Sequence, residues 1–248
     1  MQTFYLTDAG KVRSHNEDNV TILNNNNNQE FLLAVADGMG GHKAGEVASK
    51  IAIEHLTDEF DKLETFGSKD NAISWLRNVV VEINNKIFAY TDEFPNSKGM
   101  GTTLVVAIKT NDYVLFGNIG DSSGYVYKNE KLHKVTKDHT LVNLLVSTGE
   151  LTEEEAKYHP RKNVLMRALG ANDPIEIDIF DVVDNTIKGI FLCSDGLTNM
   201  LTEEQIEKIL NSDLSIEEAV VKLIRKSNSR GGTDNITIAY LKKESGDL

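Results

Sequence analysis

Two apolar runs near the middle of the chain, 113–119 and 124–127, constrain the fold more than any other feature. Both are rich in aromatic and β-branched residues, as strands are, and only residues 120–123 separate them. A parallel pair of strands needs a crossover of a dozen or more residues. The short gap therefore predicts an antiparallel hairpin.

Similar runs recur along the chain and predict further strands. These cover 31–36, 103–108, 190–193 and 236–241. The asparagine tract Asn24 to Asn28 separates the apolar stretch 20–23 from the first of them and predicts a second hairpin tip. Apolar residues at helical spacing predict helices over 44–56, 73–87 and 216–224. Strands and paired helices without strict alternation favour a layered α+β architecture.

No long Pro- or Ser-rich linker divides the 248 residues, so one domain over 1–248 is expected. The single cysteine, Cys193, excludes an internal disulfide, and its apolar surroundings favour a buried thiol over a nucleophile. His55 falls on an apolar helical stripe, where a packed, hydrogen-bonded histidine is favoured over a metal ligand. The N-terminus does not resemble a signal peptide, and no apolar run approaches the ~20 residues of a membrane span. A soluble, cytoplasmic protein is expected.

The formal net charge is -12, from 26 Lys+Arg against 38 Asp+Glu. Such a surface repels nucleic acids and anionic lipid headgroups, so neither a nucleic acid nor a membrane is expected as a partner. A phosphate-bearing substrate would need local attraction, and bound cations are the obvious source.

Acidic residues stand at the ends of predicted strands. The run 31–36 leads into Asp37-Gly38, 190–193 leads through a serine into Asp195-Gly196, and Asp234 comes just before 236–241. Any one Asp-Gly pair alone is better explained as a turn. Their repetition favours a shared site, where several carboxylates would repel one another unless cations neutralised them. Oxygen ligands select Mg²⁺ or Mn²⁺, and no Cys/His spacing indicates zinc.

The segment 13–18 places a guanidinium beside two carboxylates. Alone, it is better explained as a solvated charged turn. Together with the aspartates, it makes Arg13 a candidate phosphate ligand and Glu17 and Asp18 candidates for the metal shells. The glycine-rich stretch 38–46 has the spacing of neither a P-loop nor a dinucleotide-binding fingerprint.

Seven short motifs in order carry a family resemblance that extends over nearly the whole chain. They are Thr7-Asp8-Ala9-Gly10 with Arg13, Asn16, Glu17 and Asp18; Val35-Ala36-Asp37-Gly38-Met39-Gly40-Gly41; Gly99-Met100-Gly101-Thr102-Thr103; Gly117-Asn118-Ile119-Gly120-Asp121-Ser122; Arg167-Ala168-Leu169-Gly170; Cys193-Ser194-Asp195-Gly196-Leu197; and Gly231-Gly232-Thr233-Asp234-Asn235-Ile236-Thr237. Each motif is weak alone, and the ordered set is specific. The chain resembles the metal-dependent protein serine/threonine phosphatases of the protein phosphatase 2C type, in their compact bacterial form.

The resemblance implies an α+β fold in which a central antiparallel β-sandwich is flanked by pairs of helices, in α-β-β-α layers. It implies two core Mn²⁺ or Mg²⁺ ions and a third. Asp37 would bridge the two core ions, the Gly38 carbonyl would bind one of them, and Asp195 and Asp234 would complete the first site. Asp121 would support the third ion.

Other roles in the resemblance are less direct. Glu17 and Asp18 would act mainly through water, and Arg13 would hold the phosphate. Asn235 and His42 are further candidates, although a structural role at the helix entry suits His42 at least as well.

The family also carries a flap near its metal cleft, here at about 147–165, with Gly149, His159 and Arg161 as its candidate residues. The sequence Thr152-Glu153-Glu154-Glu155 within it is equally a good start for a plain surface helix.

This chain departs from the family pattern at two positions. Many members have an arginine where Ser123 stands, and eukaryotic forms have a histidine, a candidate general acid, where Met39 stands. The general acid is therefore unassigned.

The function implied is hydrolysis of phosphoserine and phosphothreonine in proteins by a metal-activated water, in a monomer that reverses the action of a cognate serine/threonine kinase. Two alternatives are a metal-dependent nuclease, which the charge of -12 opposes, and a non-catalytic scaffold or sensor, which would normally have lost ligands.

Overall fold

The computed structural model describes residues 1–25, 27, 29–41, 44–184 and 186–243. The strands are β1 Gln2–Asp8, β2 Asp18–Asn25, β3 Glu30–Met39, β4 Gly101–Thr102, β5 Leu104–Lys109, β6 Val114–Ile119, β7 Ser123–Lys128, β8 Lys131–Lys134, β9 Asp178–Val182, β10 Gly189–Cys193 and β11 Ile236–Lys242. The helices are α1 Ala44–Asp61, α2 Lys69–Glu93, the short 3-10 helix η1 Pro95–Ser97, α3 Leu141–Ser147, α4 Glu153–Tyr158, α5 Asp195–Thr198, α6 Glu203–Leu210 and α7 Ile216–Ser229.

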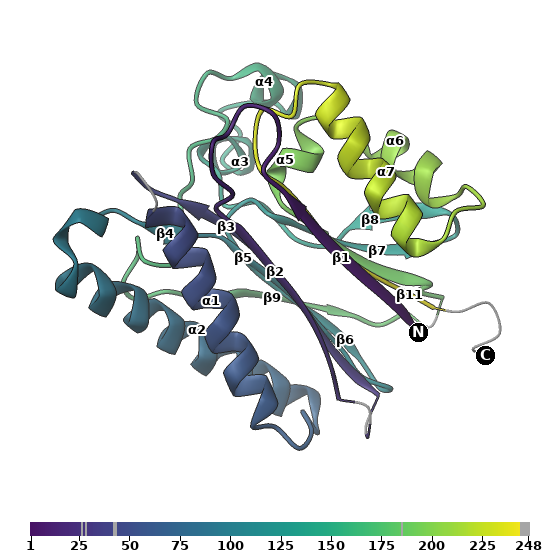
Figure 1. Cartoon of the computed structure of the whole chain (residues 1–248), viewed down its shortest axis with the longest axis horizontal. Coiled ribbons are helices and arrows are strands. Elements are labelled where there is room, and N and C mark those ends of the chain that lie inside the picture. The colour runs from purple at the N-terminus through teal and green to yellow at the C-terminus, as the bar shows by residue number, and fades with distance from the viewer. Residues whose placement is uncertain (26, 28, 42–43, 185, 244–248) are drawn as a thin grey trace.

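The strands form two antiparallel sheets. One has the order β1-β11-β10-β7-β8, and the other has the order β2-β3-β5-β6-β9, with β4 paired to β3. Helices α1 and α2 cover the outer face of the second sheet, and α6 and α7 cover the outer face of the first (Figure 1). The predicted α-β-β-α sandwich is confirmed.

Strand β3 shows why the layers stack in this way. Leu32 and Ala34 belong to the apolar cluster beneath α1 and α2, whereas Leu33 and Val35 belong to the cluster between the sheets. Successive side chains of a strand point to opposite faces, so this strand is buried on both sides. A strand that is buried on both faces is apolar along its whole length, which explains the continuous apolar run in β3.

The hairpin predicted over 113–127 is wrong. Strand β6 pairs with β5 and β9, whereas β7 pairs with β10 and β8, so the two strands lie in different sheets. The short connection therefore turns the chain from one layer of the sandwich to the other. Gly120, with φ +99°, provides part of that turn. The length of the gap excluded a parallel crossover, but it could not specify which neighbours each strand would pair with.

The second predicted hairpin is confirmed by the antiparallel pairing of β2 with β3, which ends at Asn25 opposite Glu30. Residues 26 and 28 of the asparagine tract lie outside the described residues. The predicted helices are present as α1, α2 and α7, each extending beyond the expected range at its C-terminal end. Strands β1, β4, β8 and β9 and helices α3, α5 and α6 were not predicted.

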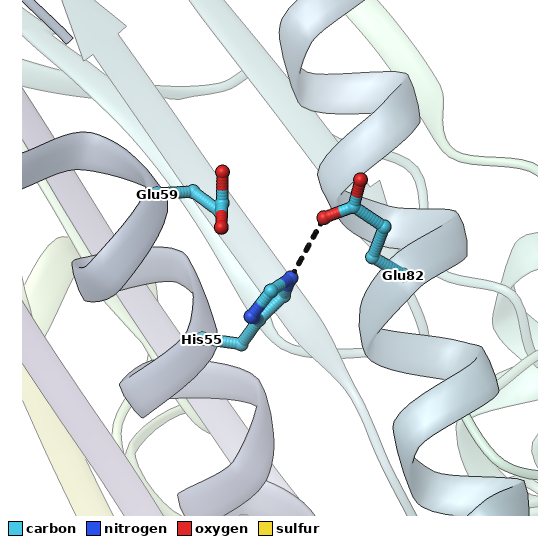
Figure 2. Close-up of side chains that lie close together, drawn as sticks. All are labelled: His55, Glu59 and Glu82. Carbon is cyan, nitrogen blue, oxygen red and sulfur yellow. Dashed lines mark hydrogen bonds and ion pairs between the residues drawn. The ribbon is translucent and has the colours of Figure 1, made fainter. Parts of the chain in front are cut away.

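Helices α1 and α2 are joined by a polar contact (Figure 2). The buried His55 ring of α1 places Nε2 2.9 Å from Glu82 Oε2 of α2. The prediction of a packed, hydrogen-bonded histidine is therefore confirmed. Among the residues that the structure describes, none of the helices has the length and apolar character needed to cross a bilayer.

Candidate metal centre

Carboxylates from both sheets meet at one end of the sandwich. Asp37, near the end of β3, lies opposite Asp18, the first residue of β2. Asp195 begins α5 two residues after the end of β10, and Asp234 lies two residues before β11, the neighbour of β10. Asp18, Asp195, Asp121 and Asp234 all raise the pKa of Asp37 through their charge, after burial as the largest cause. Carboxylates far apart in sequence therefore share one electrostatic environment.

Asp18 links the two sheets directly. Its Oδ2 accepts hydrogen bonds from Ser194 Oγ at 2.8 Å and Thr237 Oγ1 at 2.6 Å, which lie at the ends of β10 and β11 in the opposite sheet. Its Oδ1 is buried without a hydrogen-bond partner. Burial raises the pKa of Asp18 to about 7, against the lowering effect of the two hydroxyl donors. The side chain is thus held by one oxygen and leaves the other free.

Asp37 is held by its backbone. Its N–H donates to Thr103 Oγ1 at 3.0 Å, and its carbonyl accepts from Thr103 N at 2.9 Å and Thr102 Oγ1 at 2.9 Å. Thr103 Oγ1 also contacts Ser122 Oγ at 2.8 Å, so it ties the end of β3 to the turn that carries Asp121. The backbone position of the central aspartate is therefore set from a rigid support.

The N-terminal turn of α1 packs directly against the C-terminal end of β3. A Cβ at Gly38 would come 2.1 Å from the carbonyl oxygen of Gly45, so no other residue fits at this approach. Ser49 Oγ of α1 donates to the Glu17 carbonyl at 2.5 Å, and Gly38 N donates to the same oxygen at 3.1 Å. Glu17 Oε1 is buried without a partner, and burial raises the pKa of this carboxyl.

The segment that precedes Glu17 is fastened by Asn235. Its Oδ1 accepts from Glu17 N at 2.8 Å, and its Nδ2 donates to the carbonyls of Ala9 and His15 at 3.0 and 2.9 Å. Asn235 therefore serves the backbone of this loop. Arg13 lies on the same loop with its side chain half exposed, and its Nη2 donates to Asp234 Oδ2 at 2.8 Å.

Asp121 lies in the turn between β6 and β7. Burial raises its pKa to about 7, with further contributions from the charges of Asp195 and Asp138. Ser123, where the resemblance led us to expect an arginine, is buried opposite Cys193 in the β7–β10 pair. A different cation acts on this neighbourhood, since Lys134 lowers the pKa of Asp121 and pairs with Asp138 at 2.7 Å.

The predicted flap region, about 147–165, begins at the last residue of α3 and contains α4. Thr152 and Glu155 form the capping box that the sequence indicated, and α4 follows it. Gly149 has φ +78°, and His159 Nδ1 accepts from Arg161 N at 3.1 Å, with Arg161 exposed. Figure 1 shows α3 and α4 at the same end of the molecule as α5, which begins with Asp195. His42 lies outside the described residues.

The donor set fits hard divalent cations. Five aspartates and Glu17 supply only oxygen atoms, and two of those oxygens, Glu17 Oε1 and Asp18 Oδ1, are buried without partners. A buried carboxylate oxygen without a donor costs free energy unless the group is protonated or a cation binds it. The raised pKa values of Asp18, Asp37 and Asp121 favour protonation of these groups when no cation is bound. Mg²⁺ and Mn²⁺ prefer this kind of oxygen set.

The hydroxyl residues that hold the carboxylates were not predicted as site residues. Ser194 and Thr237 bond Asp18 across the sheets, and Thr103 bonds Asp37. Each stands within a residue or two of a strand end that also carries an aspartate or glycine. Their position beside these strand ends could have predicted them as site residues. The hydrogen-bond partner of each hydroxyl could not be predicted, because it depends on how the two sheets pack together.

The chain is similar to known protein phosphatases. The family model described as Protein phosphatase 2C matches residues 9–231. The serine/threonine phosphatase stp of Listeria monocytogenes is 43% identical over 244 residues, which cover 98% of this chain and 96% of the relative.

Solved structures agree as well. The crystal structure of serine/threonine phosphatase Stp1 from Staphylococcus aureus has a TM-score of 0.91 at 36% identity and covers 98% of this chain and 95% of that one. The catalytic domain of the phosphatase PstP in complex with two manganese ions has a TM-score of 0.81 at 33% identity, with 98% of each chain covered. The chain is a protein phosphatase, and it belongs to the metal-dependent protein phosphatase 2C family.

Proposed function

We propose that the carboxylates at this end of the sandwich hold two core divalent cations, Mn²⁺ or Mg²⁺, and a third. Asp37 would be the ligand shared by the core pair, with Asp195, Asp234 and the Gly38 carbonyl as further ligands. Glu17 and Asp18 would act through water, and Asp121 would support the third cation. The observation that carries the proposal is the convergence of these carboxylates from both sheets, with Glu17 Oε1 and Asp18 Oδ1 left unpaired.

The proposed substrates are phosphoserine and phosphothreonine in proteins, as in the relatives named serine/threonine phosphatases. The protein would work as a cytoplasmic monomer of one domain, 1–248, opposite a cognate serine/threonine kinase. The segment 147–165 would act as a flap, with Gly149, His159 and Arg161 at its bends and surface. Its exposed loop geometry supports that role.

The residues of the chain supply orientation and charge. When bound, the cations would supply Lewis acidity that activates a water and neutralises the phosphoryl oxygens. Arg13 offers a planar pair of donors for the phosphate, and its bond to Asp234 Oδ2 at 2.8 Å aims the guanidinium at the carboxylate cluster. No side chain of the described residues is assigned as nucleophile, and Met39 offers no proton to the leaving oxygen.

The experiment is turnover of a phosphothreonine peptide with and without Mn²⁺ by wild type, Asp37→Asn and Glu59→Gln. Asp37→Asn should lose at least about a hundredfold in kcat at saturating Mn²⁺, because it removes the shared ligand. Glu59→Gln, which changes a carboxylate of α1 near Lys62, should keep wild-type turnover. Substantial activity of a folded Asp37→Asn variant at saturating Mn²⁺ would refute the assignment.

A further inference from the structure

His139, in the loop after β8, has both ring nitrogens engaged. The N–H of Gly120 donates to Nδ1 at 3.1 Å, so Nδ1 carries no proton. Nε2, 3.1 Å from Asp178 Oδ2, then carries the proton and donates to that oxygen. Arg167 Nη1 donates to the other oxygen of Asp178 at 2.6 Å. The hydrogen bonds therefore require one neutral tautomer of the imidazole.

The charges around the ring are consistent with that tautomer. Burial is the main cause that lowers the pKa of His139, and Arg167 lowers it further, while Asp178 and Asp138 raise it. The net direction is downward, which favours the neutral ring.

On one side, His139 fixes the backbone that leads into Asp121. The carbonyl of Gly120 accepts from His139 N at 2.9 Å and from Asn118 Nδ2 at 3.1 Å. Together with the bond to Nδ1, these contacts hold both polar groups of Gly120. A Cβ at this position would come 2.6 Å from Thr103 Cγ2, so the turn is tightly packed as well.

On the other side, His139 lies at the roots of the flap, which are residues 139–140 before α3 and residues 165–167 after α4. Its carbonyl accepts from Met166 N at 2.8 Å, and the next residue, Thr140, forms a β-bridge with Leu165. Arg167 is joined to the ring through Asp178, and its Nη1 also lies 3.4 Å from Nε2, a contact that is not a hydrogen bond while Nε2 carries the proton. The chain thus leaves His139 towards α3 and returns to it after α4.

We propose that His139 is a positioning residue that couples the Asp121 turn to the roots of the flap, with Nδ1 serving the turn and Nε2–H serving the flap root. The part of this proposal that concerns metal binding rests on the proposed role of Asp121, whereas the part that concerns the flap roots does not. Each ring nitrogen has a separate partner, so the two functions can be removed one at a time.

The test uses the full chain with His139→Ala, His139→Asn and His139→Gln. An asparagine oxygen can replace Nδ1 as acceptor for Gly120 N, and a glutamine amide can replace Nε2–H as donor to Asp178. One measurement is a calorimetric Mn²⁺ titration that resolves the weaker binding step. The other is the rate of tryptic cleavage after Lys157, Arg161 and Lys162 in the flap.

His139→Ala should weaken the weaker Mn²⁺ step about tenfold, the low end for loss of a group that orients a metal ligand. It should also speed flap cleavage several-fold. His139→Asn should restore the metal step but not the flap protection, and His139→Gln should do the reverse. His133→Ala, an exposed histidine of β8, is the matched control and should change neither.

The inference is overturned if His139→Ala keeps wild-type Mn²⁺ affinity and cleavage, or if the Asn and Gln variants behave alike. Asp121→Asn in the same titration separates the two proposals. If it leaves the weaker step intact, the assignment of Asp121 fails, and the cleavage rates alone decide whether His139 positions the flap roots.

Discussion

Two groups of side chains in this molecule could each supply ligands to a metal ion. They differ in whether their charged atoms already have protein partners. Between α1 and α2, one ligand atom each from His55, Glu59 and Glu82 lies within 4.8 Å of the others (Figure 2). Each of these side chains has a protein partner, since His55 bonds Glu82 and Lys62 lies 2.5 Å from Glu59. At the end of the sandwich, by contrast, the carboxylates outnumber the cations that touch them among the residues described there, and two of their oxygens are buried without partners.

The difference teaches that closeness of ligand atoms is a poor guide to metal binding. A site needs a cation when its charges are buried and unmatched, because only then does binding relieve a large electrostatic cost. The helix group is partly exposed and each of its side chains already has a partner, so a cation would have to displace Lys62 and the His55 hydrogen bond. This comparison supports the proposal that the metals bind at the sheet ends, and we treat the helix group as a structural contact.

The largest expected effect comes from a matched pair of substitutions, one in each group. Asp195→Asn should lower Mn²⁺-dependent kcat/KM by at least about a hundredfold, since it removes a carboxylate from the metal cluster. Glu82→Gln should keep kcat/KM within about twofold of wild type. Phosphopeptide turnover over a range of Mn²⁺ concentrations measures both, and equal losses in the two variants would contradict the distinction between the groups.

Mn²⁺ should stabilise the fold through the sheet-end group. At a free concentration about 100-fold above the dissociation constant, binding contributes about 2.7 kcal/mol, which raises Tm by about 5–10 °C in a chain of this size. Glu82→Gln should show the same rise, and Asp37→Asn should show a clearly smaller one. Differential scanning calorimetry in EDTA and in Mn²⁺ tests this, and an unchanged rise in Asp37→Asn would count against the site.

Without metal, the same carboxylates should make stability depend on pH. Burial raises the folded-state pKa of Asp121 to about 7, so its contribution to stability is present below about pH 4 and is lost as the pH rises to about 7. Asp121→Asn, which cannot ionise, should therefore be more stable than wild type in EDTA above pH 7, by on the order of 2 kcal/mol. Urea unfolding at pH 4.5 and 7.5 measures the difference, which should shrink at the lower pH.

The smallest effects are expected in the helix group. Glu82→Gln weakens the contact to His55 and should cost about 1 kcal/mol of unfolding free energy. Glu59→Gln loses only an exposed pair with Lys62 and should cost about 0.5 kcal/mol or less. Urea unfolding in EDTA gives both values. A loss of several kcal/mol in either variant would show that this group contributes more to the free energy of unfolding than its exposure indicates.

The sequence predicted the layers and most buried strands, because strands such as β3 are apolar on both faces. It failed at the connection 120–122, since a short gap limits the length of a turn and says nothing about which sheet receives the next strand. Strand β1 was missed because it is an edge strand with exposed alternate residues, and helix α6 because its apolar stripe is short.

The candidate site was predictable to a different extent. The positions of Asp37, Asp195 and Asp234 follow from strand ends visible in the sequence. The contacts of Asp18 with Ser194 and Thr237, and of Asn235 with the loop 9–17, depend on how the two sheets stack. Periodicity along one strand carries no information on that stacking.

The most direct test of the central claim is the number of Mn²⁺ ions bound at equilibrium by wild type, Asp37→Asn and Glu82→Gln, measured by isothermal titration calorimetry. We predict that Glu82→Gln binds as many ions as wild type with the same affinities, and that Asp37→Asn loses the tight binding. Tight binding that persists in Asp37→Asn, or that disappears in Glu82→Gln, would contradict the account.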